Sequence, residues 1–310
     1  MSKRSKNYNF YGNFPFFTPG IKGCIILLLI FLGGAVLAAV IAAIIAAPFA
    51  ASSPEKTVEL VTVISYPVMF IPAMIYASLQ SKRNSFFDIG YELDSNNFGK
   101  MGGLMAALKA TILVLAAGFI IDILGYVMPE MPDLLKQTLQ GLTGGNVWIN
   151  FLCVSIFAPF FEEWLCRGMV LRGLLNYKKE DGTNGIKPVW AIVISAAVFA
   201  AIHGNIWQAL PAFLIGIVMG IVYYKTGSLK LTMLMHFVNN TLALTMGQID
   251  SLSEYDYWID IMGAKWYWLA FVACAMLCFL TIRAFLSLPN KQPKGGCDII
   301  NPADVIVEES

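Results

Sequence analysis

The sequence predicts an all-α protein, a polytopic membrane bundle of about eight transmembrane helices. Of its 310 residues, 57% are hydrophobic and only 13% are charged, whereas a soluble domain carries roughly 25% charged residues. Apolar runs of bilayer length recur along the chain, separated by short polar or Pro- and Gly-containing segments. Lys and Arg gather in alternate connecting segments, a pattern typical of membrane proteins that cross the bilayer repeatedly.

The first apolar run, residues 21–47, is too long for a signal-peptide core and lacks a cleavage site at the right distance. We therefore expect a signal anchor that is retained. The second run contains Pro67 and Pro72, which we expect to break its helix. Gly216 and Gly220 form a GxxxG face that favours close helix packing. The expected spans are residues 21–47, 58–79, 103–128, 147–175, 188–203, 207–224, 231–246 and 265–288.

The distribution of basic residues predicts the orientation of these spans. With the N-terminus in the cytoplasm, 16 of the 21 Lys and Arg residues fall in cytoplasmic segments. Only Lys56, Lys136 and Lys265 fall outside, and Lys109 and Arg167 lie in the membrane. The positive-inside rule thus places both termini in the cytoplasm of a multi-pass integral membrane protein, in the cell membrane if the source is bacterial.

The remaining composition excludes several classes of protein. The six cysteines include no CxxC pair, so neither a disulfide framework nor a thiolate metal site is indicated. No basic patch interleaved with aromatic residues is present, so nucleic acid is not an expected partner.

The expected fourth span carries two glutamates and one arginine within an apolar stretch. Glu163 and Arg167 are four residues apart and can pair on one helix face, while Glu162 lies about 100° further round the helix. Charges in a bilayer-length segment are costly and usually face a bundle interior. This group could be a structural Glu–Arg clamp between helices, or it could leave Glu162 free to act as a proton acceptor.

Both histidines of the chain, His203 and His236, fall at or within apolar spans rather than in loops. His236 and Asn240 share a helix face at i,i+4 spacing. A carboxylate, two imidazoles and an amide can activate water and stabilise an oxyanion. Alternatively, Glu162, His203 and His236 could be three ligands of a catalytic zinc ion with an open fourth position.

Three motifs in order give a specific resemblance. The sequence reads EExxxR at Glu162 to Arg167, FxxxH at Phe199 to His203, and HxxxN at His236 to Asn240. Over residues 147–246 the chain resembles the CAAX-protease and bacteriocin-processing (CPBP or Abi) family of intramembrane proteases, whose third motif is HxxxN or HxxxD. Each motif alone is weak, but the three together use both histidines of the chain.

The resemblance implies a role for each matched residue. Glu162 would be the general base on the attacking water, His203 would help to hold that water, and His236 with Asn240 would stabilise the oxyanion. Glu163 and Arg167 would support the structure of the site. A glutamate–water mechanism without metal is slightly favoured over one using a zinc ion. The substrate would be a peptide or membrane protein in the lipid bilayer, reached through a cavity open toward the cytoplasm. It could be a prenylated C-terminal peptide, a bacteriocin or signalling-peptide leader, or a membrane-protein tail.

The resemblance also organises the chain. We divide it into a cytoplasmic segment (1–20), helices one to three (21–146), a catalytic core (147–246), a loop with the last helix (247–288) and a polar tail (289–310). Two other functions stay open: a proton-coupled carrier, and a non-catalytic immunity or scaffolding member of the family. On an ideal helix His203 lies about 22 Å from Pro188, deeper than the other site residues. The site residues converge only if the fifth span is strongly tilted or begins later, and we expect a later start, with residues 188–191 partly in the membrane interface.

Overall fold

The structure of the chain is a computed structural model that describes residues 17–83, 93–136, 145–177, 185–249, 255 and 257–289. The described residues form helices and connecting segments and no strand, which confirms the all-α class. The predicted segment 1–20 and tail 289–310 lie almost entirely outside these residues. In chain order the helices are α1 (Ile21–Ala46), α2 (Pro54–Arg83), α3 (Gly102–Ile121), α4 (Ile123–Val127), α6 (Val147–Asn150), α7 (Ala158–Glu163), α8 (Arg172–Asn176), α9 (Pro188–Ala201), α10 (Ile206–Thr226), α11 (Leu229–Gln248), α13 (Trp258–Met262) and α14 (Ala264–Leu286), with 3-10 turns η2 (Ala47–Phe49) and η3 (Gly99–Met101) and π-helical η4 (Phe151–Phe157) and η5 (Trp164–Leu171).

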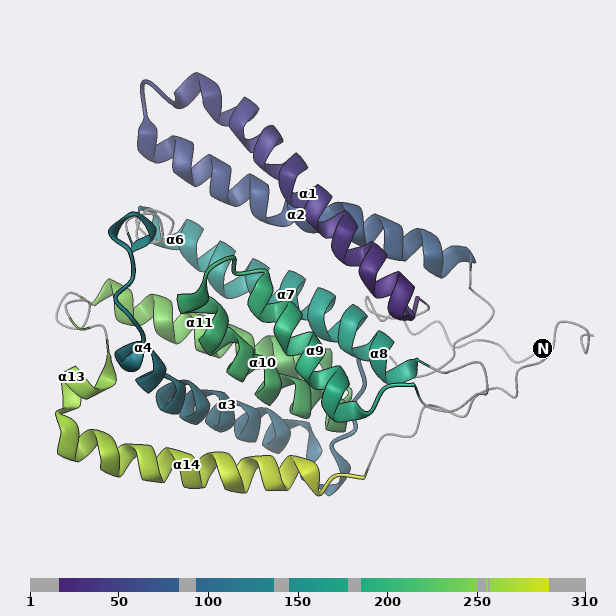
Figure 1. Ribbon diagram of the computed structural model, residues 1–310, viewed down its shortest axis with the longest axis vertical. Helices are drawn as coiled ribbons and strands as arrows, with labels where there is room; N and C mark the ends of the chain where they lie inside the picture. The colour runs from purple at the N-terminus through teal and green to yellow at the C-terminus, as the bar shows by residue number, and fades with distance from the viewer. Residues whose placement is uncertain are drawn as a thin grey trace, which may run out of the picture.

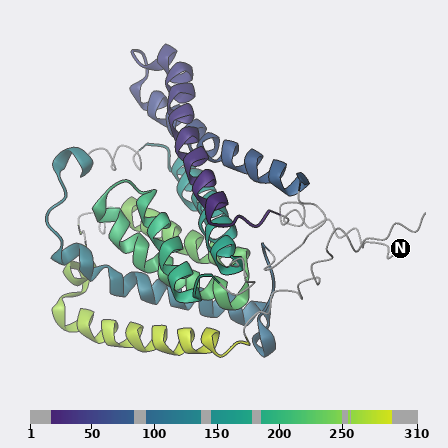
Figure 2. The ribbon, with the colours of Figure 1, turned by 45° about the vertical axis from the view of Figure 1, so that its right-hand side comes forward.

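The helices form a bundle around a central group. The α1–α2 pair lies along one side of the bundle and the α3–α14 pair along the other (Figure 1). Between them lie α9, α10, α11 and the continuous helix built from α6, η4, α7, η5 and α8, residues 147–176 and called the α6–α8 helix below. Turning the molecule shows α1 and α2 leaning away from the rest at one end (Figure 2).

Six helical stretches among the described residues are long and apolar enough to cross a membrane. They correspond to six of the eight predicted spans: Ile21–Phe49, Lys56–Gln80, Gly99–Val127, Val147–Asn176, Ile206–Thr226 and Ala264–Leu286. The other two predicted spans are helices of a different kind. α9 has only 14 residues, and α11 places His236, Asn239 and Asn240 among its apolar residues. A helix exposed to lipid needs about 20 mostly apolar residues, so these two helices suit the interior of the bundle.

The expected break of the second span is wrong. α2 runs without interruption from Pro54 to Arg83 and contains both Pro67 and Pro72. Membrane helices tolerate proline because neighbouring helices and local adjustments satisfy the freed backbone groups. Gly34 of α1 packs directly on the backbone of α2, where an added Cβ would lie 2.3 Å from the Met69 carbonyl oxygen. The two helices are therefore joined by close backbone contact.

The α6–α8 helix is the most buried of the six spans. Its apolar window is 56% buried, against 33% or less for the other five among the described residues. Asn146 caps its start by accepting a hydrogen bond from the Trp148 backbone N–H at 2.9 Å. Its π-helical turns η4 and η5 lie on either side of the segment that carries Glu162 and Glu163. Such turns occur frequently at functional sites.

Tight turns fix α9, α10 and α11 relative to one another. Gly204, with φ of +71°, and Asn205 join α9 to α10, and the Asn205 side chain caps α10 by accepting from the Gln208 N–H at 2.9 Å. Gly227, with φ of +63°, ends α10, and Ser228 caps α11. The predicted GxxxG face packs α10 on α9, because a Cβ at Gly220 would lie 2.9 Å from Ile192.

Candidate active site

The predicted Glu163–Arg167 ion pair is present and fully buried. Arg167 Nη1 donates to Glu163 Oε1 at 2.6 Å, and both side chains have no exposed surface. Arg167 Nη2 donates to the Gly216 carbonyl oxygen of α10 at 3.0 Å. The guanidinium carbon also lies 4.5 Å from the centre of the Phe199 ring of α9. This one arginine therefore ties the α6–α8 helix to both α9 and α10.

Both carboxylates of the acid pair approach the same imidazole. His236 Nδ1 lies 3.2 Å from Glu163 Oε1, and His236 Nε2 lies 4.0 Å from Glu162 Oε2. The sequence placed Glu162 on a different helix face from Glu163, and the ring of His236 is broad enough to meet both. Since a carboxylate can only accept, the Nδ1–H of His236 donates to Glu163 and turns Nε2 toward Glu162.

A residue outside the three motifs completes the surroundings of Glu162. The Tyr66 hydroxyl of α2 donates a hydrogen bond to Glu162 Oε1. Glu162 Oε2 is buried and accepts no hydrogen bond from the described residues. One oxygen of Glu162 is thus held by Tyr66, while the other faces His236 and is available for a further polar partner.

His203 lies beyond the last turn of α9, at the far end of that helix from Pro188. The helix α9 begins at Pro188 itself, and the prediction that its membrane-spanning part starts later stays a prediction. His203 Nδ1 bonds the Phe199 carbonyl oxygen at 2.8 Å. A carbonyl only accepts, so Nδ1 carries a proton and Nε2 is left for another partner.

Asn240 is held by the carbonyl of Val154 in η4, at 2.9 Å from its Nδ2. The Ala158 N–H bonds Cys153 instead, and Pro159 has no N–H, so no backbone donor of that turn serves Val154. The Ala158–Pro159 sequence thereby frees a carbonyl that orients Asn240. The carboxamide has two N–H donors, and one of them remains for a ligand. Asn239 donates to the Asn240 oxygen at 3.3 Å.

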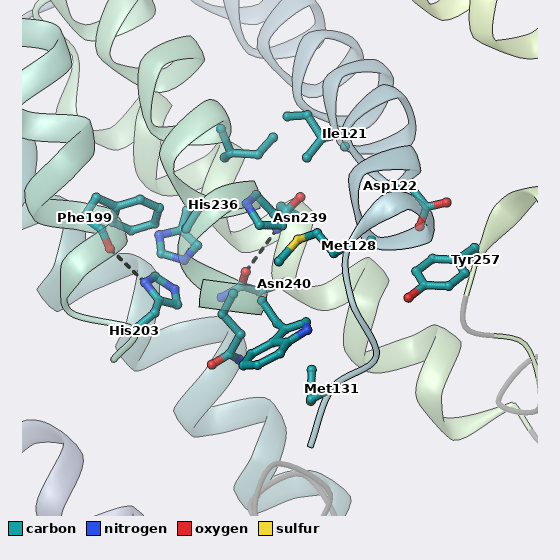
Figure 3. A pocket seen from close by; sticks show the side chains of 17 residues that line it. Ile121, Asp122, Met128, Met131, Phe199, His203, His236, Asn239, Asn240 and Tyr257 are labelled. Carbon is teal, nitrogen blue, oxygen red and sulfur yellow. Dashed lines mark hydrogen bonds between the residues drawn. The ribbon is translucent and has the colours of Figure 1, made fainter. Parts of the chain in front are cut away.

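A cavity of about 430 Å³ adjoins these side chains. His203, His236, Asn239 and Asn240 form its polar wall, with Phe199 beside both histidines (Figure 3). Glu162 does not line the cavity, but His236 does and also lies beside Glu162. The rest of the lining includes the apolar residues Ile121, Met128, Met131, Pro211 and Ile215, together with the polar side chains of Asp122, Gln208 and Tyr257.

The cavity lies toward one end of the bundle, and the prediction that it opens toward the cytoplasm stays a prediction. Its lining comes from the last turn of α3, from α4 and the segment after it, the end of α9, the first half of α10, the middle of α11 and the segment before α13. Most of these lie away from the starts of α1, α9 and α11, where Lys22, Lys187 and Lys230 stand. His203 reaches this end because it follows the last residue of α9, which begins at Pro188.

The proposed zinc ligands Glu162, His203 and His236 do not form a ligand set in this arrangement. Zinc binds nitrogen and oxygen ligands at about 2.0–2.2 Å, so the ligand atoms must surround one point. The Phe199 ring packs edge-on against both histidines, with centroids 5.2 Å from His203 and 5.3 Å from His236. The described part of the chain holds no group of three His, Cys, Asp or Glu side chains that could bind a metal ion.

The fold and the site define a helical membrane protein with buried acids, imidazoles and an amide beside a cavity. Residues 144–242 match the family model of "Type II CAAX prenyl endopeptidase Rce1-like" proteins. The resemblance predicted from the three motifs is thereby confirmed, and the match supports an intramembrane protease in general. It covers about a third of the chain. Comparisons with curated proteins and with solved structures found no match.

Sequence reasoning missed two contributors to the site. Tyr66 lies 96 residues before Glu162 and belongs to no motif, so only the packing of α2 on the α6–α8 helix reveals it. Asp122, an acid in the apolar run 103–128, lines the cavity and accepts from the Trp258 N–H at 3.0 Å. Its signal was an acid in an apolar run, but its partner across the bundle could not be read from the sequence.

Proposed function

We propose that this chain is an intramembrane endopeptidase that hydrolyses a peptide bond with a water activated by Glu162. One observation carries the proposal. The buried Oε2 of Glu162 has no hydrogen-bond partner among the described residues, and it lies 4.0 Å from His236 Nε2. The family match supports peptide hydrolysis as the reaction. Tyr66 holds the other oxygen of Glu162 and so directs the free one toward the reacting water.

The proposed reaction runs through a tetrahedral intermediate. Glu162 accepts a proton from water while the water oxygen attacks the substrate carbonyl carbon. The carbonyl oxygen becomes an oxyanion, and the free N–H of Asn240 stabilises it. Glu162 then gives its proton to the amide nitrogen as the C–N bond breaks.

The two histidines occupy different places in this scheme. His236 is the imidazole next to Glu162, and Glu163 fixes its ring. His203 lines the cavity, and because its Nδ1 bonds the Phe199 carbonyl oxygen, its Nε2 is left for another partner. We therefore propose His236 as the group that holds the water with Glu162, and His203 as a contact to the substrate. This differs from the roles that the family resemblance implied, in which His203 holds the water and His236 stabilises the oxyanion with Asn240.

The test is direct. The purified full chain in detergent is incubated with a library of labelled peptides, beside Glu162→Ala. Wild-type cleavage that the variant lacks supports the proposal. A wild type that cleaves nothing, but moves a solute across liposomes in a Glu162-dependent way, identifies a carrier instead.

Asn240→Ala is expected to lower kcat by about 10²–10³-fold with little change in KM, the loss typical of one oxyanion donor. The reason is that the amide acts mainly on charge that develops in the transition state. Thr245→Ala, an exposed position further along α11, is the matched control and should cleave normally. A rise in KM with unchanged kcat would show that Asn240 only binds substrate.

Tyr66→Phe is expected to lower kcat by about tenfold or more. A hydrogen bond to a charged group contributes about 1.5–3 kcal/mol, and losing 1.4 kcal/mol in the transition state costs a factor of ten. Tyr76→Phe on the same helix is the control, because the Tyr76 ring packs edge-on against the Phe17 ring. Equal kcat values for wild type and Tyr66→Phe would remove Tyr66 from the mechanism.

Chelation and metal analysis test whether the peptidase activity depends on a bound metal ion. We propose no step that passes through a metal ion, so purified protein treated with a chelator should keep its peptidase activity. If Glu162, His203 and His236 do bind zinc, the protein should contain about one equivalent, with ligand distances near 2.0–2.2 Å. Metal content measured on the same sample as activity decides between the two.

A further inference from the structure

The cavity lies where several chain segments meet at one end of the bundle. Trp207 at the start of α10 donates from Nε1 to the Pro129 carbonyl oxygen at 2.8 Å, which ties the segment after α4 to the cavity rim. Asp122 accepts from the Trp258 N–H, and Tyr126 packs edge-on against Tyr257, with centroids 5.7 Å apart. Of these residues, Trp207, Asp122 and Tyr257 line the cavity (Figure 3).

The opposite end of the bundle is assembled from the basic segments, and we call it the basic end. Asn97, before α3, donates to the carbonyl oxygens of Lys225 and Pro289 at 2.8 and 3.0 Å. Lys230 pairs with Asp94 at 2.8 Å, and Arg172 donates to the Phe17 carbonyl oxygen. Lys225, Lys230 and Arg172 belong to the segments that the positive-inside rule assigns to the cytoplasm, and these contacts join the segments at one end of the structure.

The site is covered from the basic end. All eight residues of η5, Trp164–Leu171, are buried, and they lie between Glu163 and the start of α8. Tyr223 and Leu229, close to the basic end of α10 and α11, are also buried, at 2% and 0% exposure. These buried residues cover the acid pair from this end, whereas the cavity adjoins His203, His236 and Asn240.

We infer that the cavity opens on the non-cytoplasmic side of the membrane. Of the 16 basic residues in the predicted cytoplasmic segments, the structure describes nine, and these stand at the basic end: Lys22, Lys82, Arg83, Lys100, Arg172, Lys187, Lys225, Lys230 and Arg283. The positive-inside rule therefore holds that end in the cytoplasm. The structure then places the cavity at the other end, next to segments that hold only three Lys.

This location defines a substrate class, and that part of the inference rests on the proposed function. The substrates are peptide segments on the non-cytoplasmic side: exported peptides, or the stretch of a membrane protein where it leaves the bilayer on that side. The cavity suits such a segment, since its lining offers imidazole and amide groups together with apolar side chains such as Met128 and Ile215. A prenylated peptide held at the cytoplasmic surface would not reach it.

Single cysteines, each in a full chain whose six native cysteines are replaced by alanine, test the orientation without relying on activity. Gln208→Cys reports the cavity, because Gln208 lines it and is exposed. Ser52→Cys, exposed at the α1–α2 turn, reports the same end, and Ser287→Cys, exposed after α14, reports the basic end. Each variant is expressed in bacterial cells and treated with a membrane-impermeant maleimide before and after permeabilisation, with the cysteine-free chain as the blank.

Gln208→Cys and Ser52→Cys should be labelled in intact cells, and Ser287→Cys only after permeabilisation. The reverse pattern, or equal labelling of all three in intact cells, overturns the inference. A peptide from the library that purified wild type cleaves is then added outside intact cells. Cleavage without permeabilisation supports the substrate class, and cleavage only after permeabilisation overturns it. Because labelling does not depend on catalysis, a chain with the expected labelling but no peptidase activity would contradict the proposed function alone.

Discussion

Glu162→Gln is expected to reduce peptide hydrolysis by about 10²–10⁴-fold, the contribution typical of a general base. Glutamine keeps the size and shape of the side chain but cannot accept a proton from water. The Tyr66 hydroxyl can still donate to the amide oxygen, so the side chain should keep its position. Substrate binding should therefore persist while turnover falls, which appears as a lower kcat with little change in KM.

The measurement is steady-state cleavage of one library peptide by the purified variant and by wild type. Glu59→Gln on α2 is the matched control, since it makes the same chemical change in a half-buried acid outside the site. The control should cleave at the wild-type rate. Full activity of Glu162→Gln would exclude Glu162 as the base and, with it, the proposed mechanism.

The sequence predicted much of the fold because apolar length and local spacing are encoded within each segment. The predicted span 207–224 corresponds to α10 at Ile206–Thr226, and the Gly227–Ser228 junction ends one helix and caps the next. The Glu163–Arg167 pair was predictable for the same reason, since four residues on a helix bring two side chains to one face.

What escaped prediction depends on contacts between segments far apart in the chain. The spacing of Glu162 and Glu163 predicts the direction of each side chain around the helix. It does not predict that one imidazole, that of His236, lies beside both carboxylates. Tyr66 reaches Glu162 only because α1 and α2 pack as a pair against the α6–α8 helix. Helical periodicity carries no information on which helix lies next to which.

The position of His203 relative to His236 also depends on packing. On an ideal helix His203 lies far from Pro188, and the sequence left open how the site residues converge. In the structure His203 follows the last residue of α9, where the Asn205 side chain donates to the His203 carbonyl oxygen at 3.0 Å. The Phe199 ring packs edge-on against both imidazoles.

Arg167→Ala is expected to destabilise the chain by about 3–5 kcal/mol, the cost of breaking a buried ion pair by removing one partner. The change leaves the Glu163 carboxylate buried without its cation, and it also removes the hydrogen bond to the Gly216 carbonyl oxygen. His236 depends on Glu163 for its orientation, so activity should fall together with stability. Thermal unfolding in detergent and yield of folded protein are the measurements.

Two further variants separate the charge of Arg167 from its shape. Arg283→Ala removes an exposed arginine of α14 and should leave stability nearly unchanged. Arg167→Lys keeps the positive charge, but an ammonium group lacks the planar fork that reaches Glu163 on one helix and Gly216 on another. It should therefore recover only part of the lost stability. If Arg167→Ala unfolds at the wild-type temperature, the Glu163–Arg167 pair does not hold α9 and α10 against the α6–α8 helix.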